Sequence, residues 1–375
     1  MSGTTTRFVL VGGFLGAGKT TLLQQAATRL AARGHRVALL VNDQAADLVD
    51  TAVLQETGAE VDEVSGGCFC CRFDDMVAAI DRLKLKARPD FIVAEPVGSC
   101  TDLSATVLQP LKQMYGRQVE PAPYSVLIDV KQVRALMRLK ERYQAPSGGF
   151  PDDVLYIYRT QVEEADAIVL NKADLVAPAD LEDLRLQLAA QFPDTPIVAI
   201  SALSGEGVDR WLDLVCEGRP AGRKIAAVDY DTYAAGEAAL GWMNAAATLR
   251  ADAAVDWISL ARQLLESVQA AVQRAGGQIG HLKLFLTGRG RGHVAGNVTS
   301  NDGPAALRGS LAQDARQVSL LLNARVRIHA EQLRDIAEAS LQAVAARHGV
   351  EAEISNMRSF FPSRPVPTHR FAAPL

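Results

Sequence analysis

The sequence is poor in aromatic residues, in net charge and in histidine, and it has no long apolar run. Aromatic side chains make up 6% of the 375 residues, and the formal net charge is −4. So small a charge gives no electrostatic reason to expect nucleic acid or an anionic membrane as the main partner. No segment approaches the apolar length needed to span a bilayer. The six histidines are scattered, with only His35 in the N-terminal half, which excludes a histidine-rich metal store.

Cysteine is also sparse, and it is unevenly placed. The chain has five cysteines, three of them in one short stretch at Cys68, Cys70 and Cys71. An odd, clustered set forms no disulfide framework and favours a reducing compartment, where such thiols bind metal or carry out redox chemistry. The first apolar run is followed at once by a glycine-rich turn, so it is a core strand and not a cleaved signal. We therefore expect a cytoplasmic protein.

A phosphate-binding pattern stands near the start of the chain. The stretch 8–23 reads FVLVGGFLGAGKTTLL, and residues 13–20 fit GxxxxGK[ST] at every fixed position. The N–H groups of such a turn wrap a polyphosphate, and the following helix adds its positive end. Lys19 is expected to reach the β and γ phosphates, and the Thr20 hydroxyl to bind Mg²⁺. The predicted nucleotide-binding residues are Gly13, Gly16, Ala17, Gly18, Lys19, Thr20 and Thr21.

Apolar runs and helical stretches alternate through the first part of the chain. The runs are continuous, which is typical of strands buried on both faces. The expected strands are 8–11, 36–41, 61–64, 91–94, 125–128, 167–170 and 197–200. The expected helices include 19–33, 51–57, 74–87 and 178–191. This alternation predicts an α/β fold of the P-loop NTPase class, with a mostly parallel central sheet, helices on both faces and ligands at the carboxyl ends of the strands.

The alternation breaks at GRPAGRK, residues 218–224, which marks the expected domain boundary. We predict a nucleotide-binding domain over 1–218, a linker over 219–230 and a smaller C-terminal α+β domain over 231–375. Its expected elements are a strand at 240–249, a helix at 256–275, three strands within 281–326, a helix at 331–347 and a strand at 351–356. The glycine-rich stretch 288–293 is expected to be a hairpin turn. Residues 361–367 are expected to be extended, because each proline excludes helix for its predecessor.

A second motif follows a later apolar strand. Residues 171–174 read NKAD, and Ser201 and Ala202 end the next strand. A carboxylate at Asp174 can accept hydrogen bonds from N1 and N2 of guanine, whereas adenine offers no matching pair of donors. Asn171 and Lys172 would shape the base pocket. Four residues alone would also fit a strand followed by a helix-capping aspartate, but together with the phosphate loop they predict GTP and GDP as ligands.

Glu95 ends the expected strand 91–94 and is followed by Pro96 and Gly98 in the sequence EPVG. In this kind of sheet, that position lies beside the phosphate loop. The carboxylate is therefore expected to reach Mg²⁺ through water or to orient the attacking water. A surface glutamate at a strand end is the alternative.

The clustered cysteines form a CxCC motif. Thiolates are soft ligands suited to Zn²⁺, Co²⁺, Ni²⁺ or Cu⁺, and three within so short a stretch converge only if the loop curls, which Gly66 and Gly67 permit. Two alternatives remain: a redox-active thiol pair and plain loop cysteines.

Three thiolates leave a fourth ligand position open. It is available to another ligand, to a relay partner or to one of three nearby carboxylates, Asp62, Glu63 and Asp74. Cys100 and Cys216 are isolated in the sequence and are expected to be buried apolar residues.

Taken together, these motifs resemble the CobW-type GTPases, relatives of the nickel chaperones UreG and HypB. The resemblance is based on GGFLGAGKTTLL at 12–23, GGCFCC at 66–71, the glutamate of AEPVG at Glu95 and NKAD at 171–174, and it covers roughly the first 215 residues. It implies a GTP-dependent metallochaperone or metal-insertion GTPase that handles Zn²⁺ or Co²⁺.

The sequence departs from this family after the second strand. Family members often have N-E-x-G-E there, whereas residues 42–46 read NDQAA and keep one acid. Asp43 is expected to serve Mg²⁺ or the switch, and Ala46 cannot supply a carboxylate to the metal site. The predicted catalytic residues are therefore Lys19, Glu95 and Asp43. The predicted magnesium ligands are Thr20, Asp43 and Glu95.

The leading hypothesis is a GTP-driven switch. GTP and Mg²⁺ would order Asp43 and the CxCC loop, and hydrolysis would release the metal to a client metalloenzyme or another metal-receiving protein. One alternative is a GTP-dependent assembly or reactivation factor for a metal- or cobalamin-dependent enzyme, with the cysteines holding a structural zinc. The other is a small-molecule kinase, against which the NKAD motif argues. A nucleotide- or metal-dependent homodimer is compatible with the switch.

Overall fold

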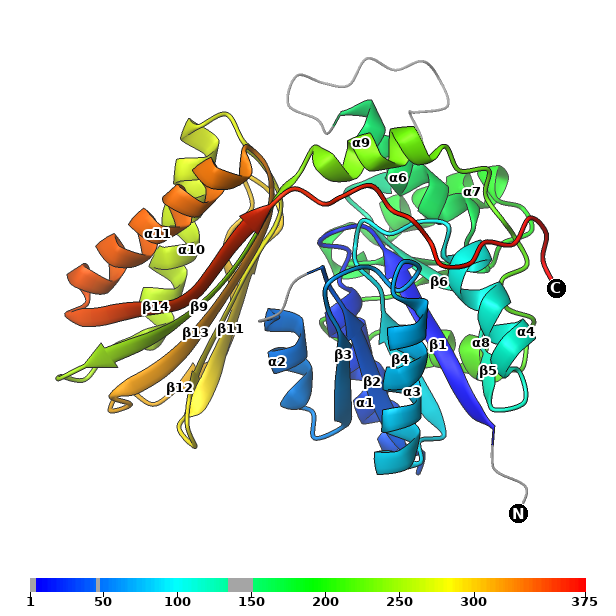
Figure 1. Ribbon diagram of the computed structural model, residues 1–375, viewed down its shortest axis with the longest axis horizontal. Coiled ribbons are helices and arrows are strands. Elements are labelled where there is room, and N and C mark those ends of the chain that lie inside the picture. The colour runs from blue at the N-terminus through cyan, green and yellow to red at the C-terminus, as the bar shows by residue number, and fades with distance from the viewer. Residues whose placement is uncertain (1–4, 45–47, 134–150) are drawn as a thin grey trace. The chain divides into compact units, whose positions relative to one another are not determined.

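The computed structural model describes residues 5–44, 48–133 and 151–375, so that position 46 lies outside the described residues. The chain forms two compact units (Figure 1). The first comprises Met1–Gln44, Leu54–Tyr233 and Pro365–Leu375, and the second comprises Ala45–Val53 and Ala234–Arg364. Each unit therefore contains a short segment that is distant in sequence from most of it. Residues 219–230, the expected linker, belong to the first unit.

A sheet of eight strands forms the centre of the first unit, in the order β3-β2-β4-β1-β6-β7-β8, with β5 paired to β1. Every pairing is parallel. The strands are β1 (Thr6–Gly13), β2 (Val37–Asn42), β3 (Glu60–Val64), β4 (Phe91–Glu95), β5 (Val119–Pro121), β6 (Ser125–Asp129), β7 (Ala167–Asn171) and β8 (Ile197–Ala199). All residues of β4, β6 and β7 are buried, so both faces of the sheet are covered. The predicted parallel α/β fold is confirmed.

The helices of this unit lie between its strands or follow the last of them. They are α1 (Lys19–Ala32), α3 (Phe73–Ala87), α4 (Gln109–Tyr115), α6 (Asp152–Glu163), α7 (Pro178–Gln191), α8 (Val208–Cys216) and α9 (Tyr230–Ala238), and α9 runs on into the second unit. A π-helical turn, η1 (Ser104–Leu108), precedes α4, and a 3₁₀ turn, η2 (Ala173–Leu175), follows β7. Helix α2 (Val49–Gln55) begins two residues earlier than the sequence predicts.

The strand order determines which loops meet. Strand β4 lies between β2 and β1, and β3 flanks β2. Since these strands are parallel, the loops that follow all four of them emerge at one edge of the sheet. Those loops contain the phosphate-binding turn, Asp43, the CxCC motif and the segment after Glu95.

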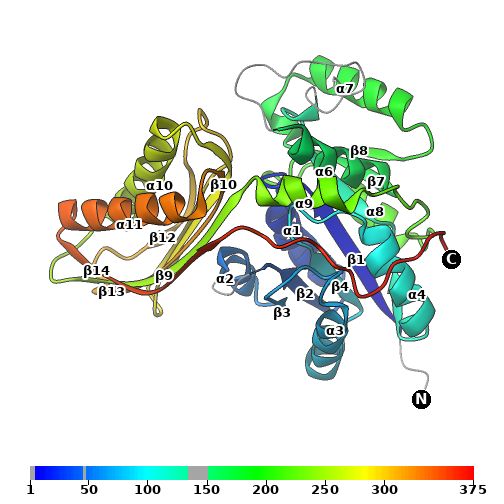
Figure 2. The same ribbon diagram turned by 45° about the horizontal axis from the view of Figure 1, so that its top comes forward.

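The second unit is an antiparallel sheet of six strands with two helices. The strand order is β12-β11-β10-β13-β9-β14. The elements are β9 (Gly241–Ala251), α10 (Trp257–Arg274), β10 (Gln278–Gly288), β11 (Gly292–Val298), β12 (Ala306–Leu311), β13 (Gln317–Arg327), α11 (Ala330–Arg347) and β14 (Val350–Phe360). Figures 1 and 2 show α10 and α11 on the same side of this sheet, where their apolar side chains form one core with it. The predicted α+β class is confirmed, and so is the hairpin turn at 288–293.

One strand count was wrong. We predicted three strands within 281–326, and the structure has four between residues 278 and 327. The additional strand, β12, is a short edge strand whose residues are mostly exposed. It therefore lacks the alternation of apolar and polar residues by which half-buried strands are recognised.

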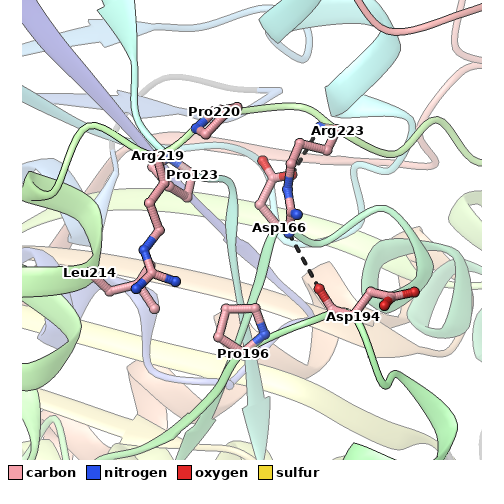
Figure 3. A pocket seen from close by; sticks show the side chains of 8 residues that line it. All are labelled: Pro123, Asp166, Asp194, Pro196, Leu214, Arg219, Pro220 and Arg223. Carbon is pink, nitrogen blue, oxygen red and sulfur yellow. Dashed lines mark hydrogen bonds and ion pairs between the residues drawn. The ribbon is translucent and has the colours of Figure 1, made fainter.

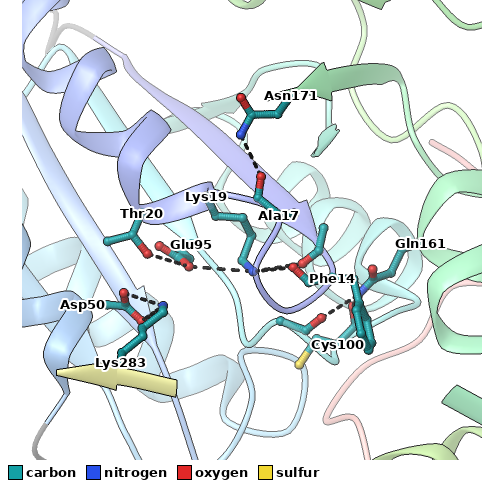
Figure 4. Close-up of polar contacts among 12 residues, drawn as sticks. Phe14, Ala17, Lys19, Thr20, Asp50, Glu95, Cys100, Gln161, Asn171 and Lys283 are labelled. Atoms are coloured by element: carbon teal, nitrogen blue, oxygen red, sulfur yellow. Dashed lines mark hydrogen bonds and ion pairs between the residues drawn. The ribbon is translucent and has the colours of Figure 1, made fainter. Parts of the chain in front are cut away.

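A segment that follows β2 in the sequence packs within the second unit. The Val49 amide donates to Asn323 Oδ1 (2.8 Å), and Lys283 Nζ pairs with the Asp50 carboxylate at 2.7 Å, as Figure 4 shows. Apolar contacts join Val49 and Val53 to Phe285 and Ala295.

Among the described residues, no helix is both long and apolar enough to cross a membrane.

Candidate functional site

The phosphate-binding turn joins β1 to α1. Gly18 precedes the helix with φ +98°, and a Cβ on it would lie 2.4 Å from Asn171 Nδ2, so this position requires glycine. Lys19 is 6% exposed, and its Nζ donates to the carbonyl oxygens of Gly13 (2.9 Å) and Phe14 (3.3 Å). The ammonium group is therefore held across the turn, where the oxygen atoms of a polyphosphate would lie. Thr21, also predicted to bind the nucleotide, is a half-buried residue of α1.

Two of the predicted magnesium ligands are in contact. The Thr20 hydroxyl donates to Glu95 Oε1 at 3.3 Å, and Lys19 Nζ lies 3.8 Å from the same oxygen (Figure 4). Adjacent oxygen ligands of an octahedral Mg²⁺ lie about 2.9 Å apart, so Thr20 and Glu95 fit this ion with little movement. Asp43 is half-buried directly after β2, and its amide donates to the carbonyl of Val64 (3.1 Å). All three residues therefore belong to the same edge of the sheet.

Asn171 connects the phosphate-binding turn with the two predicted base loops. Its Nδ2 donates to the carbonyl of Ala17 (2.7 Å), and its Oδ1 accepts from the amide of Ala202 (2.9 Å). Ser201 is buried beside it, and its Oγ accepts from the amide of Ser204 (3.2 Å). Asn171 thus fixes the three loops relative to one another.

Lys172 and Asp174 complete the base loops. Lys172 has a left-handed backbone, with φ +64°, and its Nζ pairs with Asp129 Oδ2 at 2.6 Å. Asp174 lies in the turn η2 with an exposed side chain, available to a base. The sequence reasoning missed Asp129, although its position at the carboxyl end of an apolar strand was the available signal.

The cysteine loop brings three sulfur atoms together. The Sγ atoms of Cys68, Cys70 and Cys71 are separated by 3.0 Å (68–70), 3.2 Å (68–71) and 3.7 Å (70–71). Gly66 and Gly67 both have positive φ, which gives the loop its curl. Tetrahedral zinc with Zn–S bonds near 2.3 Å needs S···S separations of about 3.8 Å, so an opening of under about 1 Å would admit the ion. These three thiols form the group of potential metal ligands found among the described residues.

Asn42, the last residue of β2, holds the cysteine loop from beneath. Its Nδ2 donates to the carbonyls of Val64 and Gly67 (both 2.8 Å), and its Oδ1 accepts from the amide of Phe69 (2.8 Å). Asn42 is buried, and the next residue is Asp43. The sequence reasoning placed Asn42 in a polar segment but gave it no role.

The C-terminal tail crosses the cysteine loop from the other end of the chain. The Val366 amide donates to Cys71 Sγ at 3.3 Å, and the Thr368 amide donates to the carbonyl of Cys70 at 2.8 Å. Farther along, the Leu375 amide donates to Gln109 Oε1 in α4 (2.9 Å), and Figures 1 and 2 both show the tail alongside that helix. Residues 361–367 have no helix or strand, as predicted. Their role at the thiols was not predicted.

The thiols of the cluster differ in acidity. Hydrogen bonds from the thiols of Cys100, Cys70 and Cys71 hold the pKa of the Cys68 thiol well below its usual range. Cys68 therefore favours the thiolate form, which is the form that binds metal.

Cys100 is not the isolated cysteine that we expected from the sequence. It is buried, as predicted, but its thiol is hydrogen-bonded to the thiols of Cys68 and Cys70. The isolation was apparent only along the sequence, because parallel strands bring the loop after β4 beside the loop after β3. Cys216 ends α8 and is half-buried. Of the carboxylates suggested as a fourth ligand, Asp62 is instead paired with Arg82 at 2.8 Å.

A buried glutamate anchors the loop that contains Cys100. The Glu164 side chain accepts from the Ser104 amide (2.9 Å) and the Thr101 hydroxyl (3.2 Å), and it is fully buried. Burial raises the pKa of Glu164 from 4.5 to about 8.

This pKa shift predicts a pH-dependent stability. Between the two pKa values, the folded chain keeps a proton that the unfolded chain releases, so stability present below pH 4.5 is lost as the pH rises towards 8. Replacing Glu164 by glutamine removes this titration. We expect the melting temperature of the wild type to fall by several degrees more than that of Glu164→Gln over this range. The exposed neighbour variant Glu163→Gln is the control, and equal slopes for all three proteins would contradict the prediction.

A pocket in the first unit lies at the edge of the sheet where the strands begin, opposite to the phosphate-binding turn. Figure 3 shows its lining side chains. The pocket is lined by Pro123, Asp166 and Pro196, which precede β6, β7 and β8, together with Asp194, Leu214, Arg219, Pro220 and Arg223. Asp166 is occupied there, since its carboxylate accepts from the amides of Tyr124, Gly222 and Arg223. These hydrogen bonds anchor residues 222 and 223 to the start of β7, and the pocket contains none of the predicted site residues.

The fold and this site define a class of protein: a P-loop nucleotide-binding protein with a thiol cluster beside the phosphate-binding turn. The family described as CobW/HypB/UreG, nucleotide-binding domain, matches residues 7–199 of the chain. The chain therefore belongs to that family, as the resemblance in the sequence predicted.

Curated relatives agree with this family. The chain is 29% identical over 217 residues to a zinc chaperone CobW of Sinorhizobium sp. The matched region covers 52% of this chain and 59% of that protein. The chain is 29% identical over 181 residues to the zinc chaperone YeiR of Escherichia coli K12 (48% and 50%), and 28% identical over 184 residues to zinc-regulated GTPase metalloprotein activator 1 of Schizosaccharomyces pombe (47% and 41%). The chain thus spans about half the length of the curated relatives it matches.

Solved structures of similar proteins include HypB from Helicobacter pylori in complex with nickel, with 19% identity, 57% of this chain and 86% of that chain covered, and a TM-score of 0.40. They also include the Zn(II)-bound YjiA GTPase of E. coli, with 17% identity, 90% and 99% covered, and a TM-score of 0.34. At these scores, the fold assignment depends on the strand order of the chain itself.

Proposed function

We propose that the chain is a GTPase that binds a transition metal through its cysteine loop and couples GTP hydrolysis to delivery of that metal to a receiving protein. Membership of the CobW/HypB/UreG family supports the nucleotide part. The three convergent thiols support the metal part. Cytoplasmic location and a metalloenzyme client are part of the same proposal, and so is a dimer that depends on nucleotide or metal.

The residues at the phosphate-binding turn fit the chemistry of GTP hydrolysis. Lys19 would hold the β and γ phosphates, and the oxygen atoms of Thr20, Asp43 and Glu95 would hold Mg²⁺, directly or through water. Bound Mg²⁺ would neutralise negative charge on the phosphates during transfer of the γ-phosphoryl group to water. Glu95 would alternatively orient the attacking water. Asp174 would accept from N1 and N2 of guanine, so the expected nucleotides are GTP and GDP.

Zinc is the metal best supported. Thiolates prefer Zn²⁺ and Co²⁺ over Mg²⁺ or Ca²⁺. The relatives from Sinorhizobium and E. coli are named zinc chaperones. Cobalt remains the second candidate, because the same tetrahedral thiol set accommodates it.

The connection between the two sites is the observation that best supports coupling. Asn42 makes three hydrogen bonds with the segment 64–69, and Asp43, a proposed magnesium ligand, is the next residue. A movement of Asp43 on GTP hydrolysis would therefore displace Asn42 and the loop above it. Ordering of a switch segment by the γ-phosphate and Mg²⁺ is a known source of such movement.

Metal titration in two nucleotide states tests the coupling. We expect the zinc affinity in the presence of a non-hydrolysable GTP analogue to differ from that with GDP by about 5- to 150-fold, the usual range of coupling between sites. Asn42→Ala should reduce this ratio towards unity while the variant still binds each ligand alone. Equal zinc affinities in the two states of the wild type would contradict coupling.

The second candidate is a GTP-dependent assembly or reactivation factor in which the cysteines hold a structural zinc. The burial of Cys68 and Cys70 favours this alternative. A structural zinc would stay bound through GTP turnover, whereas a delivered zinc would transfer to a chromogenic chelator during turnover. The zinc content measured before and after turnover separates the two functions.

A further inference from the structure

Cys100 is a buried thiol beside the cysteine loop. The three thiols of the CxCC motif leave a fourth ligand position of the metal site open. It is 1% exposed and lies five positions after Glu95 in the loop that follows β4. Its thiol is hydrogen-bonded to the thiols of Cys68 and Cys70, the two most buried members of the cluster. Cys100 therefore adjoins two of the three thiols, while its sulfur lies outside the group of three whose Sγ atoms are all within 4.8 Å of one another, so the binding of an ion would have to draw it towards Cys71.

The backbone around Cys100 is held in place on several sides. Gln161 Nε2 donates to the carbonyls of both Cys100 (2.8 Å) and Gly98 (3.0 Å), and Figure 4 shows this contact. The Cys100 amide donates to the carbonyl of Val97 at 2.9 Å, closing a turn.

Two further anchors follow directly in the sequence. The amide of Thr101 donates to the Tyr233 hydroxyl at 3.3 Å, and Arg370 Nε in the tail donates to Asp102 Oδ2 at 2.7 Å. These contacts fix the position of the Cys100 backbone. A fixed backbone suits a metal ligand, because its sulfur must be positioned before the ion arrives.

The geometry points to Cys100 as the fourth thiolate ligand of the transition metal, and we infer a four-sulfur site formed by Cys68, Cys70, Cys71 and Cys100. This inference rests on the proposed binding of metal by the CxCC motif. Four thiolates in tetrahedral geometry are a preferred environment of Zn²⁺, and they also accept Co²⁺. On binding, each ligand that is still a thiol releases its proton to solvent.

A fourth ligand on this loop also gives the nucleotide a second route to the metal. Glu95 is the last residue of β4 and Cys100 lies five positions later in the loop that follows, and Glu95 is in contact with Lys19 and Thr20 of the phosphate-binding turn. A shift of Glu95 would withdraw Cys100 and leave a site of three thiolates, which holds its ion less tightly. Release would thus begin at the buried side of the cluster.

Cobalt substitution tests the inference in the full chain. Tetrahedral Co²⁺ with thiolate ligands absorbs in the near ultraviolet in proportion to the number of thiolates. We expect Cys100→Ala to lose about a quarter of this absorbance and to bind zinc about a hundred-fold more weakly, as the loss of one ligand in four predicts. Cys216→Ser, which changes the remaining cysteine, should leave both unchanged. Unaltered absorbance and zinc affinity in Cys100→Ala would overturn the inference.

Two further readouts keep the test decisive. If wild-type protein shows no thiolate absorbance with Co²⁺, the proposed metal function fails as a whole, which is distinct from failure of Cys100 alone. GTP-analogue binding reports whether Cys100→Ala is folded. If it is not, X-ray absorption on zinc-loaded wild type decides: four sulfur neighbours support the inference, and three sulfurs with one oxygen or nitrogen overturn it.

Discussion

Replacing Cys68 and Cys70 together by serine should abolish tight zinc binding. Zinc binding by thiolate sites is worth about 10–16 kcal/mol, so the loss of two thiolates is expected to weaken the affinity by about four orders of magnitude. Cys68 should contribute most to the rate of binding, since its pKa lies well below the usual range, which favours the thiolate form that binds metal. The measurement is a competition titration with a chromogenic zinc chelator.

The matched control for this pair is Cys216→Ser. Cys216 ends α8 and lies outside the cluster of potential metal ligands, so its replacement should leave zinc binding intact. GTP-analogue binding to the double variant should stay within a few-fold of the wild type, because the side-chain hydrogen bonds of Cys68 and Cys70 that the structure gives are made with other thiols. Zinc binding that survives the double substitution would show that the metal site lies elsewhere.

Lys19→Ala should remove GTP hydrolysis. The Lys19 ammonium is buried at the phosphate-binding turn, and loss of a preorganised charged donor at a reacting phosphate costs about 10²- to 10³-fold in rate. The substitution also leaves Glu95 buried without its 3.8 Å counter-charge, so the folded state must be checked by thermal unfolding. Phosphate release under saturating GTP is the measurement.

Lys86→Ala serves as the control for Lys19→Ala. Lys86 forms an exposed ion pair with Glu60, and its removal should change neither hydrolysis nor stability appreciably. Zinc affinity without nucleotide should be the same in Lys19→Ala as in the wild type. Hydrolysis at the wild-type rate in Lys19→Ala would contradict the assignment of this lysine to the phosphates.

The features that the sequence predicted well are local ones. The phosphate-binding turn is formed by consecutive residues, and its glycines have the positive φ values that their positions require. The buried strands were recognisable because both faces of the parallel sheet are covered, so that each strand is a continuous apolar run. Edge strand β12 has no such signal, and it was missed.

The features that the sequence could not predict depend on strand order and on distant contacts. Cys100 meets Cys68 because β4 lies next to β2 and near β3 in space, which no spacing of cysteines along the chain reveals. Asn42 could not be distinguished by sequence from other polar residues at strand ends, because its role depends on hydrogen bonds to the cysteine loop. Val366 and Cys71 are separated by 295 positions, and because the donor is a backbone amide, the identity of residue 366 does not indicate the contact.

The contact of the tail with the cysteine loop has a consequence for biosynthesis. A ribosome makes the chain from its N-terminus, so the cysteine loop emerges early and Val366 and Arg370 emerge after almost all of the second unit. Until then, Cys71 lacks its amide donor and Asp102, beside Cys100, lacks its arginine partner. The covered thiol cluster is therefore complete only after residues 366–370 have been made, and until then a nascent chain would expose its thiols to oxidation and to adventitious metal.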